Sequence, residues 1–250
     1  MHRFFLPPPE CRGDALSLTG GEAHHALHVL RLRRGEMVIV LDGAGSELIC
    51  EVRGSGRDAV QLAVSKRSSV PPPAGRITLL QAVPKGKTIE TIIQKATELG
   101  ASRVVPLLSE RVAVRLDASA AVQKAEKWQG IAIEAIKQCG QPWLPKIEAP
   151  VTPEEFLARR EVFDLALIAS LQPGARHPRE YFQAFRAEHG RWPGSLGVWV
   201  GPEGDFTNTE VAAAIGQGAR PISLGPLVLR SETAALYCLS ILNYELQSPL

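Results

Sequence analysis

The chain has 250 residues, 45% of them hydrophobic, and a formal net charge of +2 at pH 7. This length and apolar content are enough for one large core or two modest ones, which indicates a globular protein. No apolar run is long enough to span a membrane, and the first residues lack a signal-peptide pattern, so we expect a cytoplasmic protein without a membrane partner. The small net charge does not by itself indicate nucleic-acid binding, so any RNA surface must be local.

Short β-like runs dominate residues 1–70, at 37–41, 47–52 and 59–64. Glycine-containing turns at 42–45 and 54–57 separate them, and this spacing predicts a small barrel. One helical segment, 21–31, interrupts the pattern and places His24 and His28 on one face. Without a third ligand nearby, this pair favours a polar or RNA-facing surface over a metal site, and we predict no metal.

The proline-rich segment 68–75 marks a domain boundary, because consecutive prolines stiffen the chain and cannot donate ladder hydrogen bonds. After it, strands and helices alternate. We predict strands at 76–83, 103–108, 163–169, 196–200 and 220–224, and helices at 88–99, 119–138, 178–188 and 231–246, with a further helix starting near Thr207. Five strands with intervening helices predict an α/β fold with a mainly parallel sheet and helices on both faces.

The cysteines at 11, 50, 139 and 238 are far apart and form no CxxC pair. This spacing predicts neither a disulfide framework nor a zinc site. We therefore expect each cysteine to be a small buried apolar residue.

Two glycine-containing turns lie close together near the end of the chain, in Gly201–Glu210 and Leu224–Ala234. Each begins where a short apolar strand ends and a helical pattern starts. Thr207 and Glu210 have the spacing of a capping box, which predicts the helix start. In an open α/β sheet, turns at strand ends face the ligand crevice, so we predict a binding site there.

Several familiar sites are excluded by their missing residues. The segment from Gly86 to Thr88 matches the end of a phosphate-binding P-loop, but Gln81 stands where the first glycine is required. No GxGxxG dinucleotide loop and no GxSxG elbow are present. Backbone-rich turns can instead hydrogen-bond an adenine or a ribose, and the guanidinium of Arg230 can stabilise charge on a reacting oxygen.

Motifs along almost the whole chain resemble the RsmE family, the ribosomal RNA small subunit methyltransferase E proteins of the SPOUT superfamily. In the second part these are KGK at 85–87, QKATELG at 94–100, GPEG at 201–204 with Phe206 and Glu210, and LG at 224–225 through LRSETA at 229–234. In the first part, HRFF at 2–5 and the segment from His25 to Leu32 resemble the PUA-like domain of that family.

This resemblance implies a PUA-like β-barrel that binds RNA at residues 1–70. It also implies a SPOUT methyltransferase domain at 71–250 with a C-terminal trefoil knot, and a homodimer. The implied reaction is methylation of N3 of a specific uridine in 16S ribosomal RNA, with S-adenosyl-L-methionine as cofactor and the small ribosomal subunit as the expected partner. The cofactor-binding residues implied are Gly201, Pro202, Glu203, Gly204, Leu224, Gly225 and Leu229.

The reaction needs help with proton removal, since the imide nitrogen of uracil is a weak acid. By resemblance, Arg230 stabilises the charge that develops on a uracil oxygen. Glu232 has three open roles: it orients Arg230, accepts the proton, or stabilises the helix start. The expected RNA-binding residues are His25, Arg31, Arg33, Lys85 and Lys87.

The chain departs from the family pattern at two positions. Asp205 stands where the family usually has a third glycine, and Gln141 stands where we expect an arginine. Two other functions stay open at this stage. One is ribose 2′-O-methylation of RNA on the same fold, and the other is a non-enzymatic RNA-binding dimer.

Overall fold

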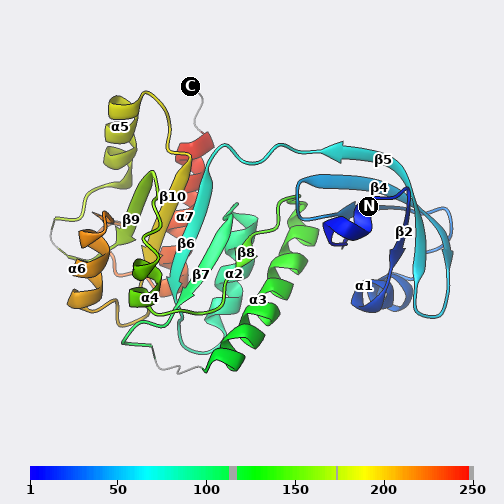
Figure 1. Cartoon of the computed structure of the whole chain (residues 1–250), viewed down its shortest axis with the longest axis horizontal. Helices are drawn as coiled ribbons and strands as arrows, with labels where there is room; N and C mark the ends of the chain where they lie inside the picture. The colour runs from blue at the N-terminus through cyan, green and yellow to red at the C-terminus, as the bar shows by residue number, and fades with distance from the viewer. Residues whose placement is uncertain (113–116, 173, 248–250) are drawn as a thin grey trace. The chain divides into compact units, whose positions relative to one another are not determined.

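A computed structural model describes residues 1–112, 117–172 and 174–247. The chain divides into two compact units (Figure 1). The first contains Met1–Pro72 together with Ile133–Leu144, and the second contains Pro73–Ala132 and Pro145–Leu250. Within the described residues, no helix is long and apolar enough to cross a membrane.

The first unit is built on a five-stranded mixed sheet that forms a half-barrel. The order is β1-β3-β4-β5-β2, with β1 parallel to β3 and the other neighbours antiparallel. Three strands confirm the predicted runs, while β1 and β2 were not predicted because each has only four residues. The strands are β1 (His2–Phe5), β2 (Ala15–Leu18), β3 (Met37–Leu41), β4 (Ser46–Ser55) and β5 (Val60–Ser69).

The helical segment of this unit is not one regular helix. A single turn, η1 (Pro8–Cys11), precedes it, and α1 (Gly20–His24) continues into a π-helical turn, η2 (His25–Val29). The predicted helix at 21–31 is therefore wrong in its last residues, because the wider turn ends it and Arg31 takes a φ of 55°. His24 and His28 do share a face, with ring centroids 4.9 Å apart.

The end of α3 (Ala118–Cys139) and the segment after it pack with the first unit, although they are distant in sequence. The Arg3 guanidinium donates to the carbonyl of Gln138 at 3.1 Å, and Lys137 forms an ion pair with Glu22 at 2.6 Å. The backbone amide of Leu144 donates to the carbonyl of Gly43 at 3.0 Å. No local pattern in the sequence indicates these contacts, and the boundary at residues 70 and 71 stays a prediction.

The second unit contains a parallel sheet in the order β11-β9-β10-β6-β7-β8. The five predicted strands are present, but the predicted number is wrong, since a sixth strand of two residues has no detectable apolar pattern. The strands are β6 (Arg76–Ala82), β7 (Arg103–Leu107), β8 (Lys146–Ile147), β9 (Leu165–Ala169), β10 (Ser195–Val200) and β11 (Arg220–Ile222).

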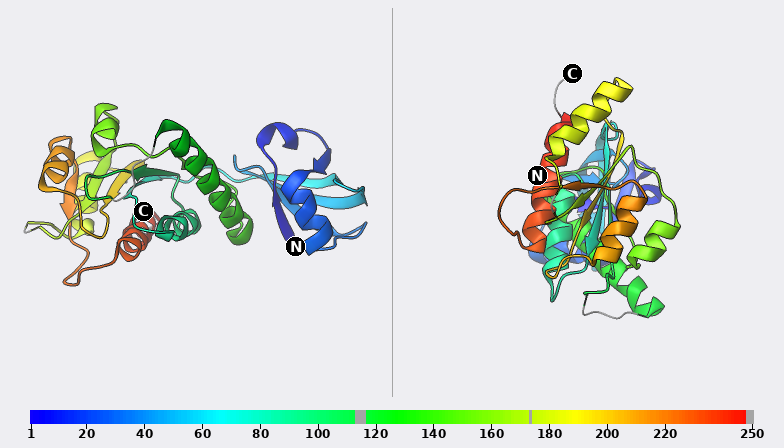
Figure 2. Two further views of the ribbon diagram at one scale, coloured as in Figure 1. Left: turned by 90° about the horizontal axis from the view of Figure 1, so that it is seen from below. Right: turned by 90° about the vertical axis from the view of Figure 1, so that its left-hand side faces the viewer.

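Helices cover both faces of this sheet. Figure 2 shows α2 (Thr88–Glu98) and α7 (Ser231–Gln247) on one side, and α4 (Pro153–Ala158) and α6 (Asn208–Gly216) on the other. The helix predicted at 88–99 is present as α2, and its apolar side chains Ile89, Ile92, Ile93 and Ala96 are buried in the core. The sequence reading missed α4, and α5 (Pro178–His189) packs against α7.

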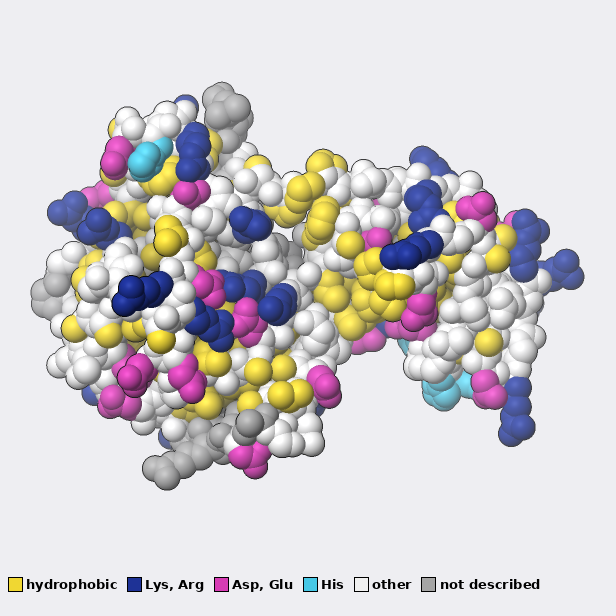
Figure 3. All heavy atoms as spheres, in the orientation of Figure 1, with side chains coloured by type: hydrophobic (Ala, Val, Ile, Leu, Met, Phe, Trp, Pro, Cys, Tyr) yellow, Lys and Arg dark blue, Asp and Glu magenta, His cyan; other side chains and the backbone are white. Residues whose placement is uncertain are grey.

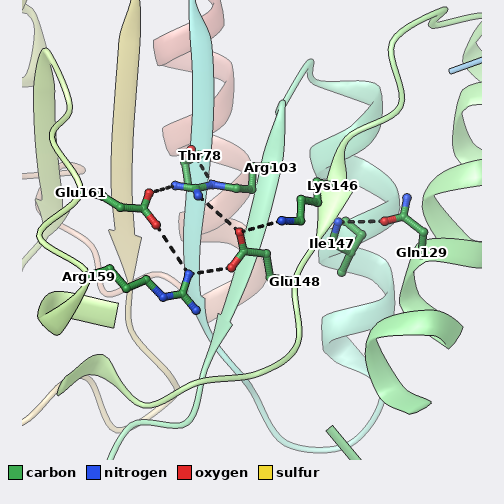
Figure 4. A network of polar contacts seen from close by, with 8 residues as sticks. All are labelled: Thr78, Arg103, Gln129, Lys146, Ile147, Glu148, Arg159 and Glu161. Atoms are coloured by element: carbon green, nitrogen blue, oxygen red, sulfur yellow. Dashed lines mark hydrogen bonds and ion pairs between the residues drawn. The ribbon is translucent and has the colours of Figure 1, made fainter. Parts of the chain in front are cut away.

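A network of charged side chains joins the amino ends of β6 and β7 to the segments that follow β8 and α4 (Figure 4). The Arg103 guanidinium lies between Glu148 and Glu161, and Arg159 contacts Glu148 at 2.7 Å. The hydrogen bond from Arg103 lowers the pKa of Glu161. This network stabilises the sheet at the amino ends of its strands, whereas the glycine turns lie at the carboxyl ends.

Three of the four cysteines are buried, as predicted, and burial raises the pKa of Cys11 and Cys50 to about 11 and that of Cys238 to about 12. The prediction is wrong for Cys139, which is exposed. Cys139 is the last residue of α3, where the chain turns through Gly140 with a φ of 80°.

Candidate functional site

A cleft opens at the carboxyl ends of β9 and β10, and both glycine turns line it. Because the strands of this sheet are parallel, these ends meet at one edge, where open α/β sheets bind ligands. Its walls combine backbone of the turns with apolar side chains. The lining residues are Ala169, Ser170, Leu171, Val200, Gly201, Pro202, Glu203, Asp205, Leu224, Gly225, Leu227, Val228, Leu229, Ser231 and Ala234.

Six of the seven predicted cofactor-binding residues are in this lining, and Gly204 lies just beside it. The lining residues Ala169, Ser170 and Leu171, at the end of β9 and just after it, were not predicted, because nothing in their composition marks a site. The order of the strands was the missing information, since β9 is the neighbour of β10 in the sheet.

The turn after β10 is tightly closed. The Asp205 amide donates to the carbonyl of Pro202 at 2.9 Å, and the Asp205 carboxylate accepts from the amide of Phe206 at 2.7 Å. A Cβ atom on Gly201 would lie 2.7 Å from the Asp205 carboxylate, so the turn requires glycine at position 201. Asp205 itself has a φ of 60°, in the left-handed region that favours glycine. This conformation gives a physical reason for a glycine at this position in a family pattern.

Two side chains fasten this turn to its neighbours. The Glu203 carboxylate accepts from the backbone amide of Lys85 at 3.0 Å, which connects the turn to the segment after β6. The guanidinium of Arg111 donates to the carbonyl of Gly204. Arg111 was not singled out from the sequence, because its partner is a backbone atom far along the chain.

The predicted capping box of α6 is confirmed. The Thr207 hydroxyl accepts from the amide of Glu210, and the Glu210 carboxylate accepts from the amide of Thr207 at 2.8 Å. The other oxygen of Glu210 accepts from the amide of Glu110 at 2.9 Å. The start of α6 is therefore fixed both by its own residues and by the loop after β7.

Arg230 and Glu232 flank the point where the second turn enters α7. The neighbours of Arg230, Leu229 and Ser231, both line the cleft, and the Arg230 side chain is exposed. Glu232 is half-buried in the first turn of α7, where a carboxylate is favourable to the helix dipole. Among the described side chains, no ion pair connects Arg230 to Glu232.

The predicted RNA-binding residues fall in both units. His25 is half-buried beside Phe4, with ring centroids 6.3 Å apart, while Arg31 and Arg33 are exposed on the first unit. Lys85 and Lys87 are exposed on either side of Gly86, in the second unit. On the face drawn in Figure 3, basic and acidic side chains are interspersed and form no continuous basic area.

Comparison with known proteins shows which class of protein this chain belongs to. The RNA methyltransferase domain family matches residues 71–243, and the RNA methyltransferase PUA domain family matches residues 18–65. The parallel sheet with its cleft and the smaller β unit are thus those of a PUA-containing RNA methyltransferase.

Individual relatives narrow this class. The chain is 32% identical to ribosomal RNA small subunit methyltransferase E of Bacillus subtilis, over 98% of this chain and 97% of the relative. A Legionella pneumophila structure solved with the bound cofactor SAM has 31% identity and a TM-score of 0.86, over 97% of this chain and 96% of the other. The Neisseria gonorrhoeae ribosomal RNA small subunit methyltransferase E bound to S-adenosyl methionine has 26% identity and a TM-score of 0.83, over 98% and 97%. The chain belongs to the ribosomal RNA small subunit methyltransferase E family.

Proposed function

We propose that this protein methylates N3 of a specific uridine in the RNA of the small ribosomal subunit, with S-adenosyl-L-methionine as methyl donor. The observation that carries the proposal is the cleft in which both glycine turns meet at the carboxyl edge of the sheet. Family membership supports the substrate class, since the relatives are named as methyltransferases of small-subunit ribosomal RNA.

The cleft has the chemistry that this cofactor requires. Leu171, Leu224 and Leu229 supply apolar surface for an adenine ring, and the turns offer backbone groups as hydrogen-bond partners. When bound, S-adenosyl-L-methionine supplies an electrophilic methyl group on a cationic sulfonium. The carboxylates of Glu203 and Asp205 line the same cleft and favour a cation there.

Arg230 has the chemical role of stabilising negative charge on a uracil oxygen as N3 loses its proton. Its exposed guanidinium follows directly on a residue of the cleft wall, so a base presented at the mouth of the cleft is accessible to it. Glu232 is assigned to the helix start or to proton acceptance, since no ion pair joins it to Arg230 within the described residues. The target base must be unpaired, because N3 lies on its Watson-Crick edge.

The RNA is bound through His25, Arg31, Arg33, Lys85 and Lys87, whose positive or polar side chains suit phosphate contacts. The proposal includes a homodimer, a trefoil knot in the second unit and a location in the cytoplasm, where small subunits are assembled. The homodimer and the knot follow from the family resemblance.

Nucleoside analysis of small-subunit RNA tests the proposal. RNA from cells without the gene should lack one 3-methyluridine that reappears when the gene is restored, and purified protein with small subunits and S-adenosyl-L-methionine should restore it in vitro. Loss of a 2′-O-methylated nucleoside instead would assign ribose methylation. An unchanged nucleoside profile together with no binding of S-adenosyl-L-methionine in calorimetry would leave a non-enzymatic RNA-binding protein.

A further inference from the structure

A buried chain of hydrogen bonds lies directly beneath the cleft. The Gln81 side-chain amide donates to the hydroxyl of Ser231 at 2.9 Å, and that hydroxyl donates to the carbonyl of Gly201 at 2.7 Å. Gln81 is 0% exposed and Ser231 is 4% exposed. The chain therefore connects the end of β6, the start of α7 and the first residue of the turn after β10.

Gln81 determines which way the Ser231 hydroxyl points. A serine hydroxyl has one proton and can rotate to serve several acceptors. Because Gln81 donates to this oxygen, the Ser231 proton is directed to the remaining acceptor, Gly201. This carbonyl belongs to the first residue of one glycine turn, while Ser231 directly follows Arg230 at the end of the other. The Ser231 side chain therefore holds the two halves of the site against each other.

Gln81 is retained at a cost to stability. Its other side-chain atom, the carbonyl oxygen, is buried and has no hydrogen-bond partner among the described residues. A buried unsatisfied acceptor destabilises a fold, because the group loses its hydrogen bonds to water and gains none in return. An apolar residue would remove this cost at a position that faces α7 in the core, so stability alone does not account for glutamine here.

We propose that Gln81 is a positioning residue for the methyl-donor site, acting through Ser231 on the Gly201 carbonyl. This inference rests on the proposed function, because it assumes that the cleft binds S-adenosyl-L-methionine. Gln81 is absent from the cleft wall and reaches it only through its hydrogen bond to Ser231. Its effect is on the geometry of the two turns.

Calorimetric titration with S-adenosyl-L-methionine, alongside thermal unfolding, tests the assignment. We expect Gln81→Met to keep a melting temperature close to that of the unaltered protein, because removal of the unpaired carbonyl offsets the lost hydrogen bonds to Ser231 and Ala82. The variant should weaken cofactor binding about 5-fold, the effect of one lost hydrogen bond at the site. Ser231→Ala should weaken binding similarly, and Ser231→Thr, which keeps the hydroxyl, should restore most of it. Adding Gln81→Met to Ser231→Ala should have no further effect, because the two residues act in series.

Thr78→Val is the matched control, since Thr78 is a buried polar residue of the same strand that accepts from Arg103 at the other end of the sheet (Figure 4). It should change stability and leave cofactor binding unchanged.

Equal binding by the Gln81 and Ser231 variants and the unaltered protein would overturn the positioning role alone, as would additive losses in the double variant. If Gln81→Met does not fold, the comparison of Ser231→Ala with Ser231→Thr decides. Absence of binding by the unaltered protein would instead reject the proposed function and, with it, this inference.

Discussion

Asp205 occupies a conformation that disfavours every residue with a side chain, and its carboxylate offsets part of that cost. Its φ of 60° is left-handed, and its side chain accepts from the next backbone amide at 2.7 Å. Aspartate and asparagine tolerate this region better than other residues because they form such local hydrogen bonds. The departure from the family's glycine is therefore compatible with the same turn.

Substitutions at Asp205 separate the effect of the left-handed backbone from that of the carboxylate hydrogen bond. Asp205→Ala and Asp205→Gly both remove the carboxylate, but only alanine keeps the left-handed strain. We expect the alanine variant to be less stable than the glycine variant by about 1 kcal/mol, which lowers Tm by about 2–4 °C in a protein of this size. Asp205→Asn should match the unaltered protein. Denaturant unfolding measures these differences, and equal stability of the alanine and glycine variants would contradict the strain.

Arg230 is the side chain on which the proposed chemistry depends. Arg230→Ala should lower kcat by about 100-fold and leave the affinity for S-adenosyl-L-methionine unchanged, since the guanidinium acts on the charge of the reacting base. Single-turnover methylation of small subunits, paired with calorimetry, measures both. Arg220→Ala, at an exposed arginine of β11, is the control and should keep full turnover. Full turnover by Arg230→Ala would reject its assignment.

At the scale of elements, two helices of the second unit start with a capping box formed by a threonine and a glutamate. Thr152 and Glu155 form a capping box at α4, and Thr207 and Glu210 form one at α6. Only the second adjoins the cleft. Thr152→Ala and Thr207→Ala should each lower the free energy of unfolding by about 1 kcal/mol, and Thr207→Ala alone should also weaken cofactor binding. Equal binding by the two variants would show that the start of α6 has no influence on the cleft.

Asp164 connects the start of β9 to the start of β10 through hydrogen bonds. Its carboxylate accepts from both terminal nitrogens of Arg191 at 3.0 and 2.9 Å and from the Gly194 amide at 2.7 Å. The Arg191 hydrogen bonds, helped by those backbone amides, lower the pKa of Asp164 to about 2. The Asp164 carboxylate therefore binds a proton more tightly in the unfolded chain than in the folded one. Its contribution to the stability of the fold is complete above the ordinary aspartate pKa of about 4 and disappears as the pH falls towards 2.

Asp164→Asn should accordingly lower the free energy of unfolding by about 1–2 kcal/mol at pH 7. The difference from the unaltered protein should shrink between about pH 4 and pH 2. Denaturant unfolding at several pH values measures it, with Asp58→Asn, at an exposed aspartate, as the control. A difference that does not change with pH would argue against the ionised carboxylate as its source.

Local signals in the sequence predicted the elements that local interactions define. β10, the capping box at Thr207 and the helix α2 depend on residues within a few positions of one another, and all three are present. Elements that depend on distant partners were missed. β8 exists through its pairing with β7, and the Ile133–Leu144 segment joins the first unit through contacts with residues such as Arg3 and Gly43.

The same division holds for the site. Glycine turns are recognisable in the sequence, so most of the cleft lining was predicted. Gln81 instead bonds to the hydroxyl of Ser231, and Arg111 to the carbonyl of Gly204, and both partners are more than 90 residues away. Nothing in the composition around them marks that role. Their contribution becomes visible only when the strand order brings the ends of β6, β7 and β10 to one edge.

At the scale of the whole molecule, the proposed RNA contacts are divided between two units, with Arg31 and Arg33 on one and Lys85 and Lys87 on the other. If one RNA engages both units, removing charge from either should weaken binding and reduce its salt dependence. Each lost phosphate contact lowers the slope of log affinity against log salt by about 0.7–0.9.

The prediction is that Arg31→Ala with Arg33→Ala, and Lys85→Ala with Lys87→Ala, each reduce the slope by a similar amount, and that the fourfold variant loses the sum. Titration of small-subunit RNA at several salt concentrations measures the slopes. Arg53→Ala is the control, because Arg53 is already paired with Glu51 at 3.1 Å. If only one of the two double variants changes the salt dependence, RNA binding belongs to the unit that carries that pair. A side-chain cation that contacts no phosphate releases no counterion, so its removal leaves the slope unchanged. Additive losses from both would make the β unit part of the substrate-binding surface, and selection of the target uridine would then depend on both units holding the same RNA.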